Sequence, residues 1–375
     1  MIIQSLKNLL KARSQRFRYQ INFTRTTRTM YTNFPSTRYQ GSKRRVLDWI
    51  KECLEDIEFE TALDVFGGTG SVSYLLKTMN KTVTFNDVLL SNSTYAKALI
   101  RNSTINLSEQ WLNKVDIADP YNGIVANRYD NIFFTKEENE EIDKIVHCIF
   151  SNPNTKLKGA KKDIALFALS QSLLMKRPFN LFHRANLDIR LKECERQFGN
   201  KTTWDKSIQS LMKKNLKEAN EAVFSNGKRH HVYQKDALSV KAGYDLVYVD
   251  PPYCSENGVC ADYQNYYSFL DGICDYENWN EKIDSTKKNL PLLTKEHTFR
   301  YKSFESDLEK LFFIHSGAII VMSYKTPGQP TIEYLKNMLN KTHQSPKCHS
   351  KKFSYALNRN NGNCKENLLI AMPKK

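Results

Sequence analysis

A glycine-rich turn between a strand-like run and a helical pattern constrains the fold of this chain more than any other feature. Residues 61–66 are typical of a strand, the turn Gly67-Gly68-Thr69-Gly70 follows at once, and residues 71–79 have the pattern of a helix. A second strand pattern at 82–85 ends in Asn86-Asp87. Strand, turn, helix and strand in this order predict a βαβ unit that opens a doubly wound sheet.

The same turn predicts a ligand site, because glycines between a strand and a helix let backbone amides approach a ligand closely. The pattern is not Gly-x-Gly-x-x-Gly, and the lysine of a phosphate-binding P-loop is missing. Asp87, at the end of the next strand, is placed to hold ribose hydroxyls. These residues favour a cofactor that contains a nucleoside and no pyrophosphate; a βαβ turn without a ligand is the alternative.

A tetrapeptide later in the chain predicts the chemistry. Asp250, Pro251, Pro252 and Tyr253 follow the apolar run 246–249, so they are expected where a buried strand ends. The Asp250 carboxylate and the Pro251 carbonyl can accept hydrogen bonds from an amine, and Tyr253 can stack on a planar ring. We predict these four residues as a catalytic site for a planar heterocycle that carries an amino group. A strand end followed by a Pro-Pro turn is the alternative.

Charge and composition narrow the range of partners. The 375 residues, 40% of them hydrophobic, allow one large or two modest domains. The formal net charge of +16 predicts a polyanionic partner, with nucleic acid first and an anionic membrane second. No apolar run approaches the ~20 residues that cross a bilayer, so we expect no membrane partner. Eight cysteines without a Cys-x-x-Cys pair indicate reduced thiols in a cytosolic protein, and we expect no metal site.

Composition and periodicity divide the chain into three parts. Residues 1–35 contain no Asp or Glu and are expected to form a basic, disordered extension, with a transit-peptide-like leader and a phosphate-contacting arm as the alternatives. Residues 36–105 and 231–375 are expected to form an α/β catalytic domain that ends in a β-hairpin. Residues 106–230 turn helical and predict an inserted, mainly helical subdomain that recognises the target.

Four motifs in one order resemble the Dam-like class of adenine-N6-specific DNA methyltransferases of the restriction-modification type. The motifs are Arg38-Tyr39-Gln40-Gly41-Ser42-Lys43, the run from Asp64 to Gly70, Asn86-Asp87, and Asp250-Pro251-Pro252-Tyr253. The similarity extends from about Pro35 to the C-terminus. It implies a Rossmann-like, doubly wound methyltransferase sheet, S-adenosyl-L-methionine as the cofactor without a metal, and double-stranded DNA as the substrate.

The resemblance implies that the chain transfers a methyl group from S-adenosyl-L-methionine to the N6 amine of an adenine flipped out of duplex DNA. It also implies a restriction-modification or phage-defence setting, a cognate restriction endonuclease as a further partner, and a cytoplasmic location in a prokaryotic or phage-infected cell. An RNA adenine methyltransferase and a catalytically inactive, basic DNA-binding protein on the same scaffold are the alternatives.

Carried onto this sequence, the resemblance implies a role for each motif residue. Tyr39 and Lys43 contact the methionine end of the cofactor, Asp87 binds the ribose, and Asp250 borders both the cofactor and the target base. Hydrogen bonds from the adenine amine to Asp250 and to the Pro251 carbonyl favour a more pyramidal, more nucleophilic nitrogen. The implied cofactor-binding residues are Tyr39, Gly41, Lys43, Asp64, Phe66, Gly68, Gly70, Asp87 and Asp250.

Sequence recognition is expected in the inserted region, because Arg, Lys, Asn and Gln are the side chains that contact base edges in the major groove. The candidate DNA-binding residues are Lys176, Arg177, Asn180, His183, Arg184 and Arg190. A helix end at Arg177-Pro178 followed by a structural loop is the alternative.

Overall fold

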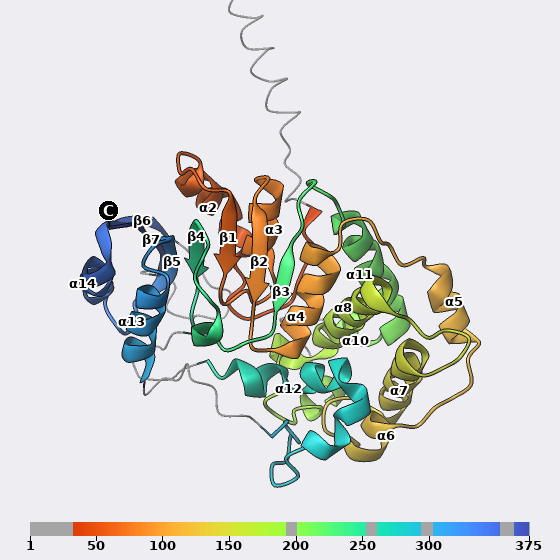
Figure 1. Ribbon diagram of the computed structural model, residues 1–375. Coiled ribbons are helices and arrows are strands. Elements are labelled where there is room, and N and C mark those ends of the chain that lie inside the picture. Colours follow the sequence, from red (N-terminus) through yellow and green to blue (C-terminus); the bar gives the residue numbers. More distant parts are fainter. Residues whose placement is uncertain (1–32, 193–200, 253–260, 294–302, 353–363, 375) are drawn as a thin grey trace, which may run out of the picture.

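The computed structural model describes residues 33–192, 201–252, 261–293, 303–352 and 364–374 (Figure 1). Residues 1–32, most of the predicted basic extension, lie outside the described part, as does Tyr253. A central sheet with helices on both faces makes this an α/β fold.

The sheet has seven strands in the order β3-β2-β1-β4-β5-β7-β6. The strands from β3 to β5 run parallel, and β7 is antiparallel to both β5 and β6. The order reverses between β1 and β4, which makes this pair the switch point of a doubly wound sheet. The strands are β1 (Thr61–Asp64), β2 (Thr82–Asn86), β3 (His231–Tyr233), β4 (Leu246–Val249), β5 (Ile319–Thr326), β6 (His343–Lys352) and β7 (Lys365–Pro373).

Helices surround the sheet and also form a region of their own beyond β3 (Figure 1). The α-helices are α2 (Leu47–Leu54), α3 (Ser71–Thr78), α4 (Leu90–Ala96), α5 (Gln110–Asp116), α6 (Ile124–Arg128), α7 (Lys136–Phe150), α8 (Gly159–Lys176), α9 (Asp188–Leu191), α10 (Lys201–Trp204), α11 (Ile208–Ala222), α12 (Tyr263–Cys274), α13 (Phe304–Ile314) and α14 (Ile332–Thr342). Short turns of 3-10 or π-helix are η2 (Lys43–Val46), η3 (Lys97–Arg101), η4 (Pro178–Asn180), η5 (Ala237–Ser239), η6 (Tyr276–Asn278) and η7 (Asn280–Lys282).

The predicted βαβ unit is confirmed as β1, α3 and β2. The glycine turn ends at Gly70, whose φ of +80° is readily adopted only without a side chain. This residue precedes the first turn of α3, so the turn directs the helix back along one face of the sheet.

Two hydrophobic cores cover the two faces of the sheet, because successive strand residues point to opposite sides. On β1, Ala62 belongs to the larger core and Leu63 to the smaller one. The larger core includes side chains from α2, α3 and α4, and the smaller includes side chains from α13 and α14. Burial on both faces explains why β4 is apolar at every position instead of alternating.

The larger core continues from the sheet into the helical region. Helices α8 and α11 pack against each other, and α8 also contacts α4 of the α/β part. Helix α12 follows β4 in the sequence, yet it packs against both α4 and α8. The segment 106–230 therefore shares one core with the sheet, and α12 belongs spatially to the helical side.

The C-terminal hairpin tests the sequence prediction only in part, because most of its predicted first strand lies outside the described residues. The patterns predict strands at 352–357 and 367–372, and residues 353–357 are not described. The structure adds β6 (His343–Lys352), most of which the patterns did not predict. The second strand agrees with β7. Strand β6 lies at the edge of the sheet with mostly exposed side chains, so no hydrophobic alternation marks it in the sequence.

Candidate active site

A cavity of about 440 Å³ lies at the carboxyl ends of β1, β2 and β4. Doubly wound sheets bind ligands in such a crevice, at the point where the strand order reverses. Its walls come from the β1–α3 turn, the end of β2, the residues before and at η2, and the first turn of α12. Segments far apart in the sequence therefore meet at one concave site.

Two carboxylates reach this cavity from strand ends: Asp64 is the last residue of β1, and Asp87 directly follows β2. Asp64 Oδ2 accepts hydrogen bonds from the amide and the hydroxyl of Ser73, at 3.2 and 2.7 Å. Asp64 Oδ1 is buried and has no hydrogen-bond partner among the described residues. Asp87 accepts hydrogen bonds from the amides of Gly68 and Leu89, each at 2.8 Å. The Asp87 carboxylate thus fixes the glycine turn against the end of β2.

Burial raises the pKa of Asp64 to about 7 and that of Asp87 to about 6. The negative charges of Asp250 and Asp87 add to the rise at Asp64. A ligand that brings positive charge or hydrogen-bond donors would lower these pKa values by stabilising the ionised carboxylates. The acid groups therefore favour a ligand with such groups over an anionic one.

A buried lysine holds the third carboxylate of the cavity. Lys43 Nζ lies 2.8 Å from Asp250 Oδ1 and 3.5 Å from Glu366 Oε1. The Lys43 side chain is 5% exposed and that of Glu366 is 1% exposed, so water screens these charges little. Glu366 also accepts a hydrogen bond from Ser323 Oγ at 2.6 Å. Burial raises the pKa of Asp250 to about 6; Lys43 acts against this rise and Glu366 adds to it.

Three tyrosine rings form an aromatic wall of the site. The Tyr39 ring stacks on that of Tyr267 at 4.4 Å between centroids and on that of Tyr263 at 5.6 Å. The Tyr39 hydroxyl accepts a hydrogen bond from Asn92 Nδ2, and the Tyr267 hydroxyl accepts one from the Gln40 amide. These contacts join the residues before η2 to α12, and Tyr39 and Tyr263 line the cavity.

Two glycines allow close approaches at the site. A Cβ on Gly67 would lie 2.0 Å from the Phe85 ring, so no side chain fits between the turn and β2. Gly41 has a φ of +85°, and a Cβ there would lie 2.8 Å from the Tyr263 hydroxyl. Both positions require glycine for packing around the cavity.

Most of the predicted catalytic and cofactor-binding residues line this one cavity. They are Tyr39, Gly41, Lys43, Asp64, Phe66, Gly68, Asp87, Asp250, Pro251 and Pro252. Gly70 was predicted with them but does not line the cavity, because its position faces Ile100 and its role is to begin α3. Tyr253 lies outside the described residues.

Sequence reasoning missed Tyr263, Tyr267 and Glu366 at this site. The two tyrosines are four residues apart on α12, the helical spacing that places side chains on one face. That spacing, close behind the Asp-Pro-Pro-Tyr motif, was a usable signal. No sequence signal pointed to Glu366, because only the pairing of β7 with β5 brings it near Lys43.

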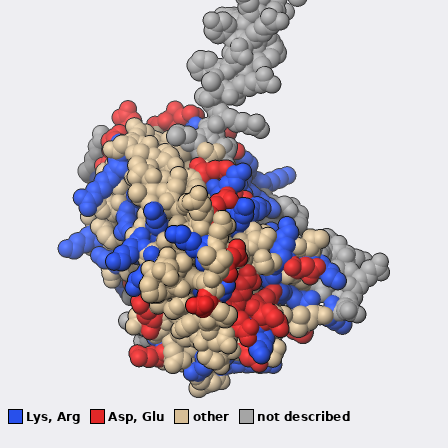
Figure 2. Space-filling model, turned by 90° about the vertical axis from the view of Figure 1, so that its right-hand side faces the viewer, with Lys and Arg blue, Asp and Glu red and all other residues tan. Residues whose placement is uncertain are grey.

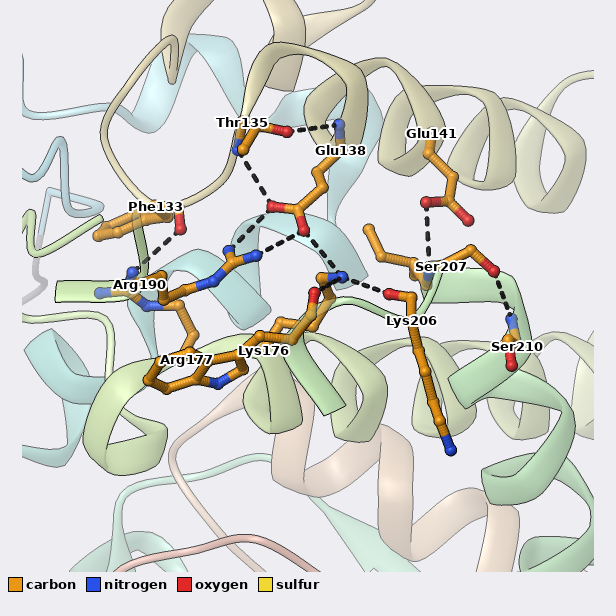
Figure 3. A network of polar contacts seen from close by, with 12 residues as sticks. Phe133, Thr135, Glu138, Glu141, Lys176, Arg177, Arg190, Lys206, Ser207 and Ser210 are labelled. Carbon is orange, nitrogen blue, oxygen red and sulfur yellow. Dashed lines mark hydrogen bonds and ion pairs between the residues drawn. The ribbon is translucent and has the colours of Figure 1, made fainter. Parts of the chain in front are cut away.

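Three of the six candidate DNA-binding residues are buried, and we withdraw them from that set (Figure 3). Lys176, Arg177 and Arg190 have side chains that are at most 5% exposed. Lys176 and Arg190 contact Glu138, and Arg177 donates hydrogen bonds to backbone carbonyls. Their charged groups are paired inside the protein and are not available to DNA, so these three residues support the alternative of a structural loop.

The other three candidates are more accessible and lie near the cavity. Arg184 is exposed, and Asn180 and His183 are half-buried. The His183 ring lies 5.0 Å from that of Tyr266, which neighbours Tyr263 at the cavity wall. The segment that carries these three residues therefore borders the site.

The positive charge is not uniform over the surface. Figure 2 shows a face on which Lys and Arg side chains alternate with groups of Asp and Glu. The formal net charge of +16 is thus a property of the whole chain and does not by itself locate a binding surface. Among the described helices, none is long and apolar enough to span a membrane. In the same described part, no three His, Cys, Asp or Glu residues are grouped as metal ligands.

The strand order with its antiparallel β7, and the cavity of acid groups and aromatic rings at the switch point, define a Rossmann-like methyltransferase fold. Residues 39–272 match the family described as D12 class N6 adenine-specific DNA methyltransferase. The chain belongs to this family, and it is an adenine-specific DNA methyltransferase that acts on the N6 amine. The family's DNA substrate disfavours the RNA alternative.

Three curated relatives are similar over most of this chain. The type II methyltransferase M2.HphI of Haemophilus parahaemolyticus is 29% identical over 251 residues, which cover 65% of this chain and 72% of that protein. The type II methyltransferase M.FokI of Planomicrobium okeanokoites is 27% identical over 82% of this chain, and the modification methylase StsI of Streptococcus sanguinis is 26% identical over 80%. The matches span about half the length of the latter two, 47% and 46%.

Proposed function

We propose that this chain methylates adenine at a specific DNA sequence with S-adenosyl-L-methionine as the donor, as part of a type II restriction-modification system. The observation that carries the proposal is that Asp87 and Asp250 line one cavity at the switch point of the sheet. The names of the three relatives, two type II methyltransferases and a modification methylase, support the biological setting.

The residues of the cavity fit the proposed cofactor. Asp87, at the end of β2, suits ribose hydroxyls, and the unpartnered buried oxygen of Asp64 suits a protonated amine. The aromatic wall offers a flat surface for a purine ring. When bound, the cofactor supplies an electrophilic methyl group. Lys43, which the family resemblance places at the methionine end of the cofactor, forms ion pairs with Asp250 and Glu366. We therefore propose that Lys43 holds Asp250 in position.

Asp250 is the residue that we assign to the target amine. Its carboxylate lies at the cavity, and Lys43 fixes Oδ1, so we assign Oδ2 to accept a hydrogen bond from the adenine amine. The Pro251 carbonyl is the second acceptor, because its peptide follows a buried strand and proline restricts the backbone. With a pKa of about 6, Asp250 is mostly ionised at pH 7 to 8 and can accept hydrogen bonds there.

The adenine must leave the duplex to reach this cavity, and unstacking costs a few kcal/mol. Stacking on an aromatic side chain returns about 1–3 kcal/mol per base, the role we propose for Tyr253. For contacts to DNA we retain Asn180, His183 and Arg184, and we add Phe179. This residue is 60% exposed, precedes Asn180 directly and has a φ of +61°.

The direct test is methyl transfer from labelled S-adenosyl-L-methionine to unmethylated genomic DNA, followed by sequencing for N6-methyladenine. We expect incorporation at one sequence context. Asp250→Asn keeps the shape but removes the charge, and we expect a loss of at least about a hundredfold in turnover, within the range of general acid–base and orientation effects.

The matched control is Asp119→Asn, an exposed change of the same charge, which we expect to leave turnover unaltered. No incorporation into several genomic DNAs would refute the proposed function and favour the inactive DNA-binding alternative. Methylation in structured RNA alone would favour the RNA alternative. We also propose a cytoplasmic location and a restriction endonuclease partner; DNA from expressing cells should then resist cleavage by that nuclease.

A further inference from the structure

A single carboxylate holds both ends of the segment that carries the exposed DNA-binding candidates (Figure 3). Glu138, in the first turn of α7, lies 2.8 Å from Lys176 Nζ and 2.6 Å from Arg190 Nη2. Its second oxygen accepts a hydrogen bond from Arg190 Nη1 at 2.9 Å. Lys176 is the last residue of α8 and Arg190 lies in α9, so Glu138 joins α8, which precedes the segment 177–190, to α9, which ends it.

The contact is buried and its geometry is well defined. The side chains of Lys176, Glu138 and Arg190 are 2%, 12% and 4% exposed. Burial acts to raise the pKa of Glu138, but Arg190 and Lys176 outweigh it and hold the pKa below its usual range. Glu138 is therefore ionised at neutral pH. Loss of this charge would leave two cations buried without their counter-ion, which is a large penalty in a protein interior.

Glu138 is itself fixed by the start of its own helix. The Thr135 hydroxyl accepts a hydrogen bond from the Glu138 amide, and Glu138 Oε2 accepts one from the Thr135 amide at 3.1 Å. This capping box removes rotational freedom from the carboxylate before either cation binds. Through Glu138, the start of α7 therefore holds the end of α8 and helix α9 in place.

Between the two tethered ends, Arg177 organises the interior of the segment. Its guanidinium donates hydrogen bonds to the carbonyls of Leu181 and Arg184, at 3.1 and 2.8 Å, and to Asn186. Arg177 also donates a hydrogen bond, at 3.1 Å, to the carbonyl of Phe133, which lies in the segment that leads into α7. The chain from 177 to 186 is thus wound around one buried side chain.

The outward side of the same segment presents groups that suit nucleic acid. Phe179 and Asn180 have φ values of +61° and +56°, uncommon for residues with side chains, and Phe179 is 60% exposed. Arg184 is exposed a few residues on. The Phe182 amide donates to the Tyr266 carbonyl, which joins the segment to α12, the helix whose first residues line the cavity.

We propose that Glu138 is a positioning residue for DNA recognition: through Lys176 and Arg190 it sets where the segment 177–190 lies relative to the cavity, and so determines sequence specificity. The inference rests on the proposed function, because it takes the exposed side of this segment as a DNA contact. Glu138 contacts no DNA itself.

The test compares Glu138→Gln with Glu141→Gln in the full chain. Glu141 lies on the same helix and accepts hydrogen bonds from the amides of Ile208 and Gln209, so it holds α11 and not the segment. The substrate is a duplex that carries the methylated sequence found in DNA from expressing cells, together with duplexes that differ from it by one base pair.

For Glu138→Gln we expect KM for DNA to rise about tenfold, the loss typical of one well-placed contact, with a smaller change in kcat. Discrimination against the altered duplexes should fall, while the affinity for S-adenosyl-L-methionine stays unchanged. Glu138→Asp, which keeps the charge, should recover part of the loss. Glu141→Gln should leave KM for DNA and discrimination as in the wild type.

A second variant covers the case in which Glu138→Gln does not fold. Arg190→Gln leaves Lys176 to balance Glu138 and releases only the α9 end, and we expect the same rise in KM and loss of discrimination. Equal effects of the Glu138 and Glu141 variants on KM and discrimination would overturn the inference.

Unchanged DNA binding by Asn180→Ala and Arg184→Ala would also overturn the inference, because the positioned segment would then not touch DNA. Methyl transfer by the wild-type chain in the same experiments would leave the proposed function standing. The two failures are therefore distinguishable.

Discussion

We predict that the negative charge of Glu366, on β7, sets the pH dependence of methyl transfer through its effect on the pKa of Asp250. In the cluster of Asp250, Lys43 and Glu366, both carboxylates contact one ammonium, so they lie within about 6 Å of each other. Glu366→Gln keeps the shape and an acceptor for Ser323 Oγ but removes one negative charge. The negative charge of Glu366 no longer acts on Asp250, so the pKa of Asp250 should fall from its raised value of about 6.

The size of the shift follows from Coulomb's law. Two unit charges about 6 Å apart at an effective dielectric constant of about 20 interact by about 3 kcal/mol, which equals about two pH units. Other titratable groups that face Asp250 are Tyr248, Tyr263 and Asp64, and the substitution leaves them in place. Because activity requires ionised Asp250, the acid limb of the profile should move to lower pH.

The assay is single-turnover methyl transfer measured between roughly pH 3.5 and 8.5, which brackets the wild-type value of about 6 and the value of about 4 expected for the variant. Glu333→Gln, an exposed change of the same charge on α14, is the matched control and should leave the limb unmoved. An acid limb that stays in place in Glu366→Gln, or that moves to higher pH, would refute this account of the cluster.

Two further predictions concern the cavity. Asp64 has a pKa raised to about 7 in the folded protein, so the folded protein binds this proton more tightly than the unfolded chain does. The contribution of Asp64 to the free energy of unfolding is therefore largest below about pH 4 and is lost as the pH rises through 7. Asp64→Asn should therefore raise the melting temperature of the cofactor-free protein at pH 8 and weaken binding of S-adenosyl-L-methionine, measured by calorimetry; unchanged cofactor affinity would contradict the assignment. Gly67→Ala should lower stability by about 1–3 kcal/mol in denaturant melts, because its Cβ would overlap the Phe85 ring, whereas Gly317→Ala, with open space around it, should cost much less.

Sequence reasoning succeeded where the information is local. The glycine turn and the strand patterns on either side of it predicted β1, α3 and β2 to within two residues at each boundary. Asp87 and Asp250 were predicted at strand ends, and each follows its strand directly. These predictions depend on backbone preferences of glycine and proline and on hydrophobic runs, which act over a few residues.

The same reasoning failed where a charged side chain has a distant partner. Arg177 and Arg190 are of a residue type that contacts DNA, but carbonyl and carboxylate oxygens in the interior of the protein accept their hydrogen bonds. Glu138, which balances Arg190, lies on another helix, and its Thr-x-x-Glu pattern with Thr135 indicates a helix start but not this pairing. Burial of an ion pair depends on how helices pack, and a single sequence does not contain that information in local form.

The sequence alone determined the opening βαβ unit, the doubly wound type of sheet and the acidic residues at the ends of its strands. The tertiary structure decided which of those residues share a cavity, that Glu366 joins Lys43 and Asp250 there, and that Lys176 and Arg190 anchor a segment from within. The physical reason is the range of the forces involved. Backbone conformation is set by neighbours in the chain, whereas charge pairing in a buried site is set by whichever strands and helices the fold brings together.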